Sequence, residues 1–437
     1  MNTSAAASAV LGLLALAACN AVTRVPDSIG TGPQPILPAP QISLIPTVNI
    51  APAIGWPPGV TPRSTEGTRV AAFATGLDHP RWLYVLPNGD VLVAETDAPP
   101  KPDDARGITG WVMGLLMKRA GAATPSANRI TLLRDTDGDG IADVRSVLLD
   151  GLNSPFGMAL VRGNLYVANS DAVIGFAYAA GDLRITRPGT KLLDLPGGSI
   201  NHHWTKNLIA SPDASKLFVT VGSNSNVGEN GMDAELERAA IWQVDLQSGQ
   251  HHIYASGLRN PNGMAWEPSS GTLWTVVNER DEIGNDLVPD YLTSVRDGGF
   301  YGWPYSYFGN HLDSRATPQN TAMADRAIVP DYALGAHTAS LGLASSVGSN
   351  FPLQFSNGMF IGQHGSWNRR PHSGYKVVFI AFEGGKPIGQ PADILTGFLN
   401  DDGKAFGRPV GVALDRKGAL LVADDVGNVI WRVSKSP

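Results

Sequence analysis

The sequence predicts an all-β fold, a six-bladed β-propeller, on three observations. Similar units recur from about residue 70 at spacings near fifty residues. Each unit is a loop, a short apolar strand, a turn of Asn, Asp, Gly or Pro, and a second apolar strand. The chain also has 50 glycines and 32 prolines, which suits many short strands joined by turns. Four-stranded units at this period indicate a propeller, and six blades fit about 370 residues better than four or eight.

The units are recognised by their opening loops, which begin at Gly76, Gly151, Ile200, Gly257 and Gly407. A degenerate unit at 357–362 fills the double gap between the last two. Because no linker-like stretch interrupts the series, we expect residues 63–437 to form one propeller domain.

The first nineteen residues have the character of an export signal. Residues 5–18 are almost wholly apolar or small and end in Leu16-Ala17-Ala18-Cys19. This ending resembles a bacterial lipobox, whose cysteine is lipidated, and Cys19 is the only cysteine of the chain. The segment before residue 9 lacks Lys and Arg, so an ordinary cleaved signal is the alternative. We expect an exported, periplasmic or cell-surface protein that meets the membrane only through a lipid anchor.

Residues 20–62 are expected to be a tether. Prolines recur from Pro26 to Pro62, which precludes regular helix and favours extended polyproline geometry. Such a spacer would hold the propeller off a membrane surface.

The charge balance excludes one class of partner. Only 16% of residues are charged and the net charge is −6, so there is no basic footprint for nucleic acid. After the N-terminus no apolar run is long enough to span a bilayer.

Residues 107–121 interrupt the repeat with an apolar, helix-compatible stretch. It is expected to be a short helical insertion, either packed on the propeller or meeting a membrane or redox partner.

Two loops carry polar residues that the repeat does not need for folding. Residues 199–204 (SINHHW) and 257–263 (GLRNPNG) each lie where a unit begins. Their histidines and their arginine–asparagine pair are therefore expected at equivalent corners near the propeller axis.

Taken together, residues 199–224, 257–305 and 358–424 resemble the soluble sugar dehydrogenases that depend on pyrroloquinoline quinone (PQQ). They are most similar to the sorbosone and aldose sugar dehydrogenase branch. The resemblance implies a propeller enzyme that oxidises a sugar or sugar-derived aldehyde by hydride transfer to PQQ. It also implies a calcium ion, and a cytochrome or another one-electron acceptor as partner.

The resemblance implies that His203 is the general base on the substrate hydroxyl. An imidazole titrates near neutrality, as this task requires. His202 stands where relatives often carry an acidic residue that orients the base, which leaves the orienting group open.

Cofactor contacts are implied for several basic residues. Arg259 and Asn260 match the pair that contacts the quinone and its carboxylates, and Arg408 matches another cofactor-facing arginine. A guanidinium fork suits a planar tricarboxylate. Val410 replaces a second arginine that commonly follows. The cofactor lysine of the family has two candidates in this chain, Arg369 and Lys376.

The calcium ion is implied to bind backbone carbonyls of Glu279 and Arg280, although relatives have Gly-Pro there. Asp281, Glu282 and Asp286 of the same loop offer side-chain ligands.

A separate acidic loop lies between two strand patterns. Asp135, Asp137, Asp139 and Asp143 resemble the first half of a calcium loop, without the distal glutamate of an EF-hand. Either a structural calcium ion or a hairpin turn without metal fits it. The aromatic cluster at 300–305 either walls the substrate mouth or packs between blades.

One other class of function is compatible with a propeller. A calcium-dependent lactonase would need several carboxylate or Asn ligands on the axis. A binding module without cofactor would need no polar site at all. Arginines and a histidine at the blade corners favour an anionic cofactor instead.

Overall fold

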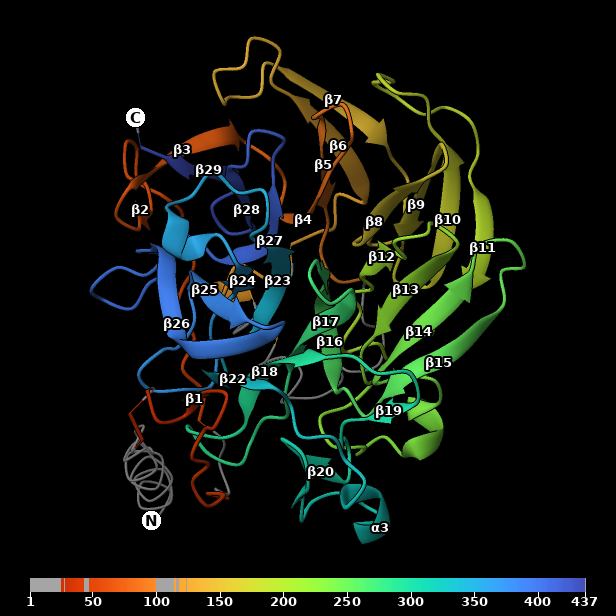
Figure 1. Ribbon diagram of the computed structural model, residues 1–437, viewed down its shortest axis with the longest axis vertical. Coiled ribbons are helices and arrows are strands. Elements are labelled where there is room, and N and C mark those ends of the chain that lie inside the picture. Colours follow the sequence, from red (N-terminus) through yellow and green to blue (C-terminus); the bar gives the residue numbers. More distant parts are fainter. Residues whose placement is uncertain are drawn as a thin grey trace, which may run out of the picture.

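Six sheets, antiparallel apart from one short added strand, stand around one axis as the blades of a propeller (Figure 1), as predicted. The computed structural model describes residues 25–26, 28–42, 47–99, 114, 118–122 and 124–436. Cys19 and most of the insertion at 107–121 lie outside these residues.

The first three blades follow one another along the chain, and the strands of each blade are given in order from the axis outward. The first contains β4 (Pro80–Val85), β5 (Val91–Glu95), β6 (Arg129–Arg134) and β7 (Val144–Leu149). The second contains β8 (Met158–Val161), β9 (Asn164–Ala168), β10 (Ala172–Ala177) and β11 (Thr190–Asp194). The third contains β12 (Leu208–Ala210), β13 (Lys216–Val221), β14 (Ala240–Asp245) and β15 (His251–Ser256), with β19 (Gly299–Phe300) added in parallel.

The last three blades also take strands from the N-terminal part. The fourth contains β16 (Asn260–Glu267), β17 (Thr272–Asn278), β18 (Pro289–Ser294), β22 (Tyr332–Ala336) and β1 (Thr31–Gly32). The fifth contains β23 (Ser340–Ser345), β24 (Gly358–Gln363), β25 (Lys376–Glu383), β26 (Lys386–Thr396) and β2 (Arg63–Ser64). The sixth contains β27 (Pro409–Leu414), β28 (Leu420–Asp424), β29 (Val429–Lys435) and β3 (Thr68–Thr75).

Pairing of β3 with β29 closes the ring, because the first full strand completes the last blade. Closure ties the N-terminal and C-terminal ends of the propeller together within one blade. Strands such as β5, β24 and β28 are buried along their whole length, since neighbouring blades pack on both their faces. The remaining elements are short: β20 (Ser306–Tyr307), β21 (His311–Leu312), α3 (Thr321–Ala324) and two 3-10 turns, Met232–Glu235 and Leu353–Phe355.

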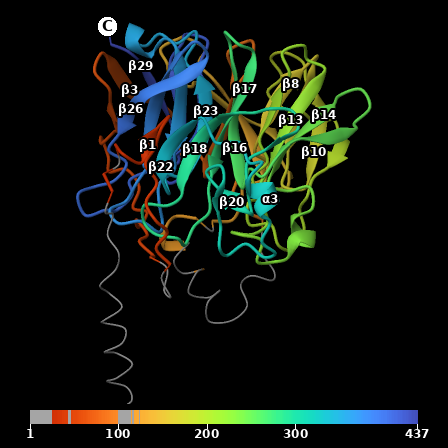
Figure 2. The same cartoon turned by 60° about the horizontal axis from the view of Figure 1, so that its bottom comes forward.

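The polar loops at 199–204 and 257–263 lie at one end of the ring. The innermost strand of each blade begins at this end and the second strand finishes there, because the two are antiparallel. We call it the axial face. In side view, β20 and α3 lie at one end of the ring (Figure 2). Asp313 directly follows β21 and forms an ion pair with Arg280, which lies just after β17 at the axial face. The end of the ring that carries β20 and α3 is therefore the axial face.

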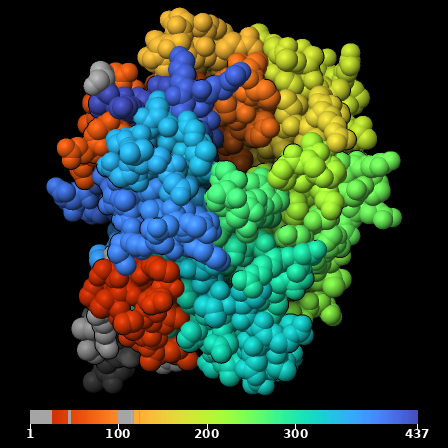
Figure 3. All heavy atoms as spheres, viewed as in Figure 1, coloured from red at the N-terminus to blue at the C-terminus, as the bar shows by residue number. Residues whose placement is uncertain are grey.

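The predicted tether is wrong for the described residues from Pro26 onward, which pack on the propeller. Ala51 is fully buried, and the amide of Ile54 donates to the carbonyl of Ala405. The ring of Trp56 packs against Phe398, Phe406 and Trp431, edge-on to the first and the last. An extended backbone leaves its amides and carbonyls unpaired, so they can bond to blade loops. Figure 3 shows this N-terminal segment, in red, against the blue C-terminal blades.

The described part of the chain contains no helix that is long and apolar enough to cross a membrane.

Candidate functional site

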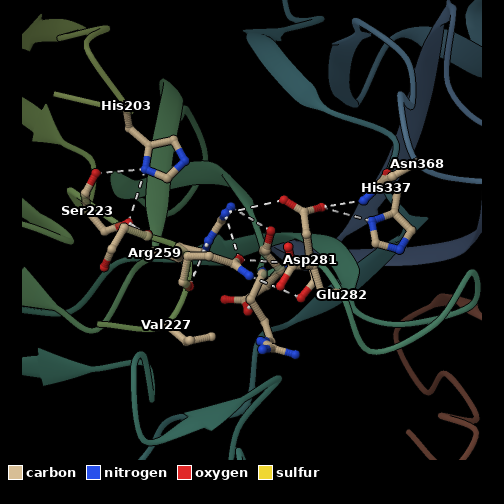
Figure 4. Close-up of polar contacts among 12 residues, drawn as sticks. His203, Ser223, Val227, Arg259, Asp281, Glu282, His337 and Asn368 are labelled. Atoms are coloured by element: carbon tan, nitrogen blue, oxygen red, sulfur yellow. Dashed lines mark hydrogen bonds and ion pairs between the residues drawn. The ribbon is translucent and has the colours of Figure 1, made fainter. Parts of the chain in front are cut away.

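His203 lies on the loop between β11 and β12, at the axial face. Its Nδ1 is 2.8 Å from the carbonyl oxygen of Ser223 and 3.0 Å from the Ser223 hydroxyl (Figure 4). Since a carbonyl only accepts, this contact assigns the proton to Nδ1 and leaves Nε2 as a hydrogen-bond acceptor. Burial, and then the charge of Arg259, lower the pKa of His203 well below its ordinary value. The ring is therefore neutral near pH 7 and able to accept a proton at Nε2.

Ser223 links this histidine to the next blade. Its amide donates to the carbonyl of Arg259 at 2.7 Å, and its hydroxyl donates to the carbonyl of Ser225 at 2.7 Å. Sequence reasoning missed Ser223, whose carbonyl and hydroxyl contact Nδ1 of His203. His202, the neighbouring histidine, is exposed.

Gly222, also missed, lies where two site residues approach one another. A Cβ built on it would lie 2.5 Å from Cβ of His203 and 2.6 Å from Oδ1 of Asn260. Only glycine leaves room for this contact.

Arg259 and Asn260 are both buried, as a pair at the start of β16. The guanidinium of Arg259 donates to the carbonyl of Glu279 at 2.7 Å and to Oδ1 of Asn226 at 3.0 Å. It lies 3.4 Å from Oδ2 of Asp281 (Figure 4). Oδ1 of Asn260 has no hydrogen-bond partner among the described residues.

Asp281 joins Arg259 to a second histidine. Its Oδ1 lies 3.2 Å from Nδ1 of His337 and accepts from Asn368 at 2.8 Å, while Nε2 of His337 is 2.9 Å from the carbonyl of Gly284. Both ring nitrogens thus face acceptors, which requires an imidazolium. Burial disfavours this charge, but Asp281 raises the pKa of His337. Burial likewise opposes ionisation of Asp281, yet His337 and Arg259 hold its pKa well below the ordinary value.

The other carboxylates of the predicted calcium loop also have cationic partners. Glu282 pairs with Arg315 at 2.6 Å, and Asp286 lies 3.7 Å from Arg369. Arg280 pairs with Asp313 at 2.7 Å. Ion pairs with residues outside the loop therefore occupy its charged side chains.

Three predicted basic residues remain, Arg369, Lys376 and Arg408, and they lie in different places. Arg369 is buried and donates to the carbonyl of Asn285 at 3.0 Å, so it holds the loop after β17. Lys376 begins β25, an outer strand, and pairs with Asp393 of β26 at 2.7 Å.

Arg408 is buried at the start of β27 and lies over the ring of Tyr375 at 5.0 Å. It donates to the carbonyl of Ala51 at 3.3 Å, but its Nε has no partner among the described residues. Of the two candidates for the lysine position, Arg369 is thus the one at the axial face.

A second polar cluster, which sequence reasoning missed, gathers at the axial ends of β4, β24 and β28. Nε2 of His364 lies 2.8 Å from Oδ2 of Asp425, which also accepts from Arg81 at 2.7 Å. His79 lies 3.6 Å from the same oxygen. The signal was present, since these residues flank repeat strands at the positions of Arg259 and Glu279 in the fourth blade.

The acidic loop 135–143 joins β6 to β7, at the end of the ring opposite the axial face. Carboxylate oxygens of Asp135, Asp137 and Asp143 lie within 4.8 Å of one another, the only such group in the described residues. Lys417 lies 3.5 Å from Asp135, and Asp139 accepts from the amide of Ile141. An ion in this loop would be remote from the site.

Two residues of the aromatic cluster at 300–305 lie in the protein interior. Tyr301 and Trp303 are buried, and the indole of Trp303 donates to the carbonyl of Asn226 at 2.9 Å.

Comparison with proteins of known sequence gives a family and more distant relatives. A model of the TrAA12-like family matches residues 124–291 and 306–436. An uncharacterised protein of Borreliella burgdorferi is 31% identical over 244 residues, covering 55% of this chain and 62% of that protein. A pyrroloquinoline quinone-dependent pyranose dehydrogenase of Coprinopsis cinerea is 23% identical over 431 residues, covering 85% and 54%. The chain thus spans between half and two thirds of the length of these relatives.

Solved structures share the fold. A Trichoderma reesei enzyme of carbohydrate-active family AA12 superposes with a TM-score of 0.69 at 19% identity, covering 89% of this chain and 99% of that one. The holo PQQ domain of the C. cinerea pyranose dehydrogenase gives 0.68 at 19% identity, covering 88% and 100%. Since the family model matches more than half of its residues, the chain belongs to the TrAA12-like family.

Proposed function

We propose that this protein is a PQQ-dependent oxidoreductase that oxidises a sugar or sugar-derived aldehyde, of the aldose, pyranose or sorbosone type. The observation that carries the proposal is the tautomer of His203. Its Nδ1 is held by the Ser223 carbonyl, so Nε2 is free to accept a hydroxyl proton beside Arg259 and Asn260. The C. cinerea relative is named as a PQQ-dependent pyranose dehydrogenase, and an Escherichia coli relative as an aldose sugar dehydrogenase.

The residues at the axial face fit a planar tricarboxylate. Arg259 and Arg408 are buried guanidiniums, and Nε of Arg408 is a buried donor without a described partner. A buried, unsatisfied N–H is costly, and a carboxylate is the acceptor that best offsets the cost. Arg369 adds a third buried cation. These three arginines and Asn260 are therefore the residues that would hold PQQ.

When bound, PQQ supplies the acceptor for the hydride that leaves the substrate carbon. The protein must take the hydroxyl proton in the same oxidation, and Nε2 of His203 is the acceptor. As the proton arrives, the Ser223 carbonyl already accepts from Nδ1 and stabilises the imidazolium. A cyclic sugar would leave as its lactone and a hydrated aldehyde as its acid. His203 returns the proton to solvent between turnovers.

Calcium belongs to the proposal because a solved T. reesei structure of this fold is a calcium structure. The carboxylates of the loop at 279–286 are not free ligands for a calcium ion, however. The carbonyl of Glu279 accepts from Arg259, and Asp281, Glu282 and Asp286 have cationic partners. No catalytic step is therefore assigned to calcium. Asp135, Asp137 and Asp143 would hold a structural ion only.

The partners follow from the same proposal. A reduced quinone cofactor must return its electrons, and a cytochrome or another one-electron acceptor would take them. We further propose that the protein is exported and lipid-anchored through Cys19. Metabolic labelling with a fatty acid in the wild type and in Cys19→Ala tests the anchor.

Reconstitution tests the function. Purified protein is titrated with PQQ in the presence and absence of calcium, followed by absorbance, and dye reduction is then measured with a panel of aldoses, pyranoses and sorbosone. We expect stoichiometric binding and oxidation of at least one sugar. Absence of both binding and turnover would overturn the proposal. Arg408→Met should weaken binding, whereas Arg416→Met, an exposed arginine at the opposite end of the same blade, should not.

A further inference from the structure

Two buried cations hold the loop that carries His203. Lys206 is fully buried, and its Nζ lies 3.1 Å from the carbonyl of His203, 3.3 Å from that of Trp204 and 3.5 Å from Oδ1 of Asn201. The side chain therefore folds back over the turn that contains the histidine. Three acceptors around one nitrogen match the three N–H groups of an ammonium.

Arg238 holds the same loop from the next strand connection. It is buried, and it donates to Oδ1 of Asn201 at 3.0 Å and to the carbonyl of Gly197 at 2.8 Å. Asn201 thus accepts from both cations. The loop between β11 and β12 has no strand ladder of its own, so these contacts supply what a sheet supplies elsewhere.

Neither cation forms an ion pair with a carboxylate among the described residues. Burial, followed by the charge of Arg238, lowers the pKa of Lys206 well below its ordinary value. A structural role alone would be met by an apolar side chain at lower cost, since burying an unpaired charge is unfavourable. What the Lys206 amine secures through its N–H groups is the position of two successive carbonyls, those of His203 and Trp204.

The same loop is tied to the segment that carries Arg259. Asn262 donates to the hydroxyl of Thr205 at 3.1 Å, and Asn207 donates to the carbonyl of Asn262 at 3.0 Å. These bonds fix the far end of the loop, whereas the Lys206 contacts fix the turn at the histidine itself.

We propose that Lys206 is a positioning residue for His203, and that it keeps Nδ1 on the Ser223 carbonyl so that Nε2 faces the substrate. Its role as a positioning residue rests on the proposed function of His203 as the base. The geometric claim, that Lys206 sets the tautomer and environment of His203, does not need the enzyme to be active.

The test is NMR of ring-labelled histidine in the protein without added cofactor. In the wild type we expect His203 as the Nδ1–H tautomer, with a titration midpoint well below the ordinary value of a histidine. In Lys206→Met the ring should lose this tautomer preference, and its midpoint should move toward the ordinary value. Lys206→Arg should restore part of the wild-type behaviour. Lys191→Met, at an exposed lysine of β11, is the matched control and should change nothing.

Circular dichroism and the unfolding midpoint show whether each variant is folded. If Lys206→Met does not fold, Asn201→Ala removes the shared acceptor and should produce the same shift of the His203 midpoint. A folded Lys206→Met or Asn201→Ala protein with wild-type tautomer and midpoint would overturn the proposal.

In reconstituted enzyme, Lys206→Met should lower kcat about tenfold to a hundredfold, as expected for a displaced catalytic group, with a smaller change in KM. The plateau of the pH profile should move with the His203 midpoint. If the NMR effects are found but no variant or wild type oxidises a sugar, the positioning stands and the proposed function fails.

Discussion

The carbonyl oxygen of Ser223 accepts from Nδ1 of His203 at 2.8 Å, while the amide of Ser223 donates to the carbonyl of Arg259 at 2.7 Å. One residue at the end of β13 thus connects the candidate base on its own blade with the candidate cofactor-binding arginine on the next. Because both bonds use the backbone, truncating the side chain of Ser223 does not remove them directly. The site must therefore be tested through the side chains and the glycine around this link.

His203→Gln is expected to abolish most turnover. Glutamine can still donate to the Ser223 carbonyl but cannot accept a proton, so kcat should fall by about a hundredfold to ten-thousandfold. PQQ binding, followed by absorbance, should be retained. His202→Gln is the matched control, at an exposed neighbouring histidine, and should keep kcat within a small factor. Equal losses in the two variants would show that His203 is not the base.

Gly222→Ala is expected to disturb the site although it adds one methyl group. The new Cβ would lie 2.5 Å from Cβ of His203 and 2.6 Å from Oδ1 of Asn260, closer than such contacts allow. Overpacking of this kind costs about 1–3 kcal/mol in the free energy of unfolding. Urea unfolding measures that cost, and PQQ titration should show weaker binding. Gly384→Ala, in an open turn between β25 and β26, should leave binding unchanged; weakened binding there would point to general instability.

The fold was predictable because each repeat consists of local sequence patterns. A strand, a turn and a second strand recur at about fifty residues, and closure by β3 needs only one more strand. His203 and Arg259 were found because they interrupt that pattern with chemistry. Ser223, Gly222 and Lys206 were not, since their roles come from backbone carbonyls and close approaches between blades, and these have no sequence signature.

The wrong prediction of a tether has a similar cause. Prolines indicate an extended backbone but not whether it is solvated or laid on a surface. Trp56, which packs the segment onto the propeller, was the residue that indicated this contact, and it was overlooked because the segment was interpreted from its proline content. In the calcium loop the carboxylates were visible in the sequence, but their partners, Arg315 and His337, lie far away along the chain.

Glu279→Gln is expected to stabilise the protein at high pH. Burial raises the pKa of Glu279 to about 7, against an ordinary value of 4.5. A carboxyl with a raised folded-state pKa costs nothing below pH 4.5, and its cost grows as pH rises toward 7 and is constant above. The variant removes this cost, so at pH 8 it should unfold with up to about 3 kcal/mol more free energy than the wild type. At pH 4 the two should be nearly equal.

Urea unfolding at both pH values provides the measurement for Glu279. The exposed Glu383→Gln serves as control and should show no such difference between the two pH values. A stability gain of Glu279→Gln that is independent of pH would contradict the assigned burial of a titrating carboxyl.

Substitutions of Trp56 decide whether the N-terminal segment is part of the domain. The indole nitrogen donates to Oδ2 of Asp424 at 2.6 Å, and the ring packs on Phe398, Phe406 and Trp431. Trp56→Phe keeps most of the packing but removes a hydrogen bond to a buried carboxylate, which should cost about 1–3 kcal/mol. Trp56→Ala also opens a cavity and should cost about 3 kcal/mol or more in the free energy of unfolding. Ile36→Ala, at an exposed side chain of the same segment, should cost little. A free tether would make all three variants as stable as the wild type. The graded losses expected instead follow from a segment that completes the core between the fifth and sixth blades, next to Arg408, whose amide donates to the same Asp424.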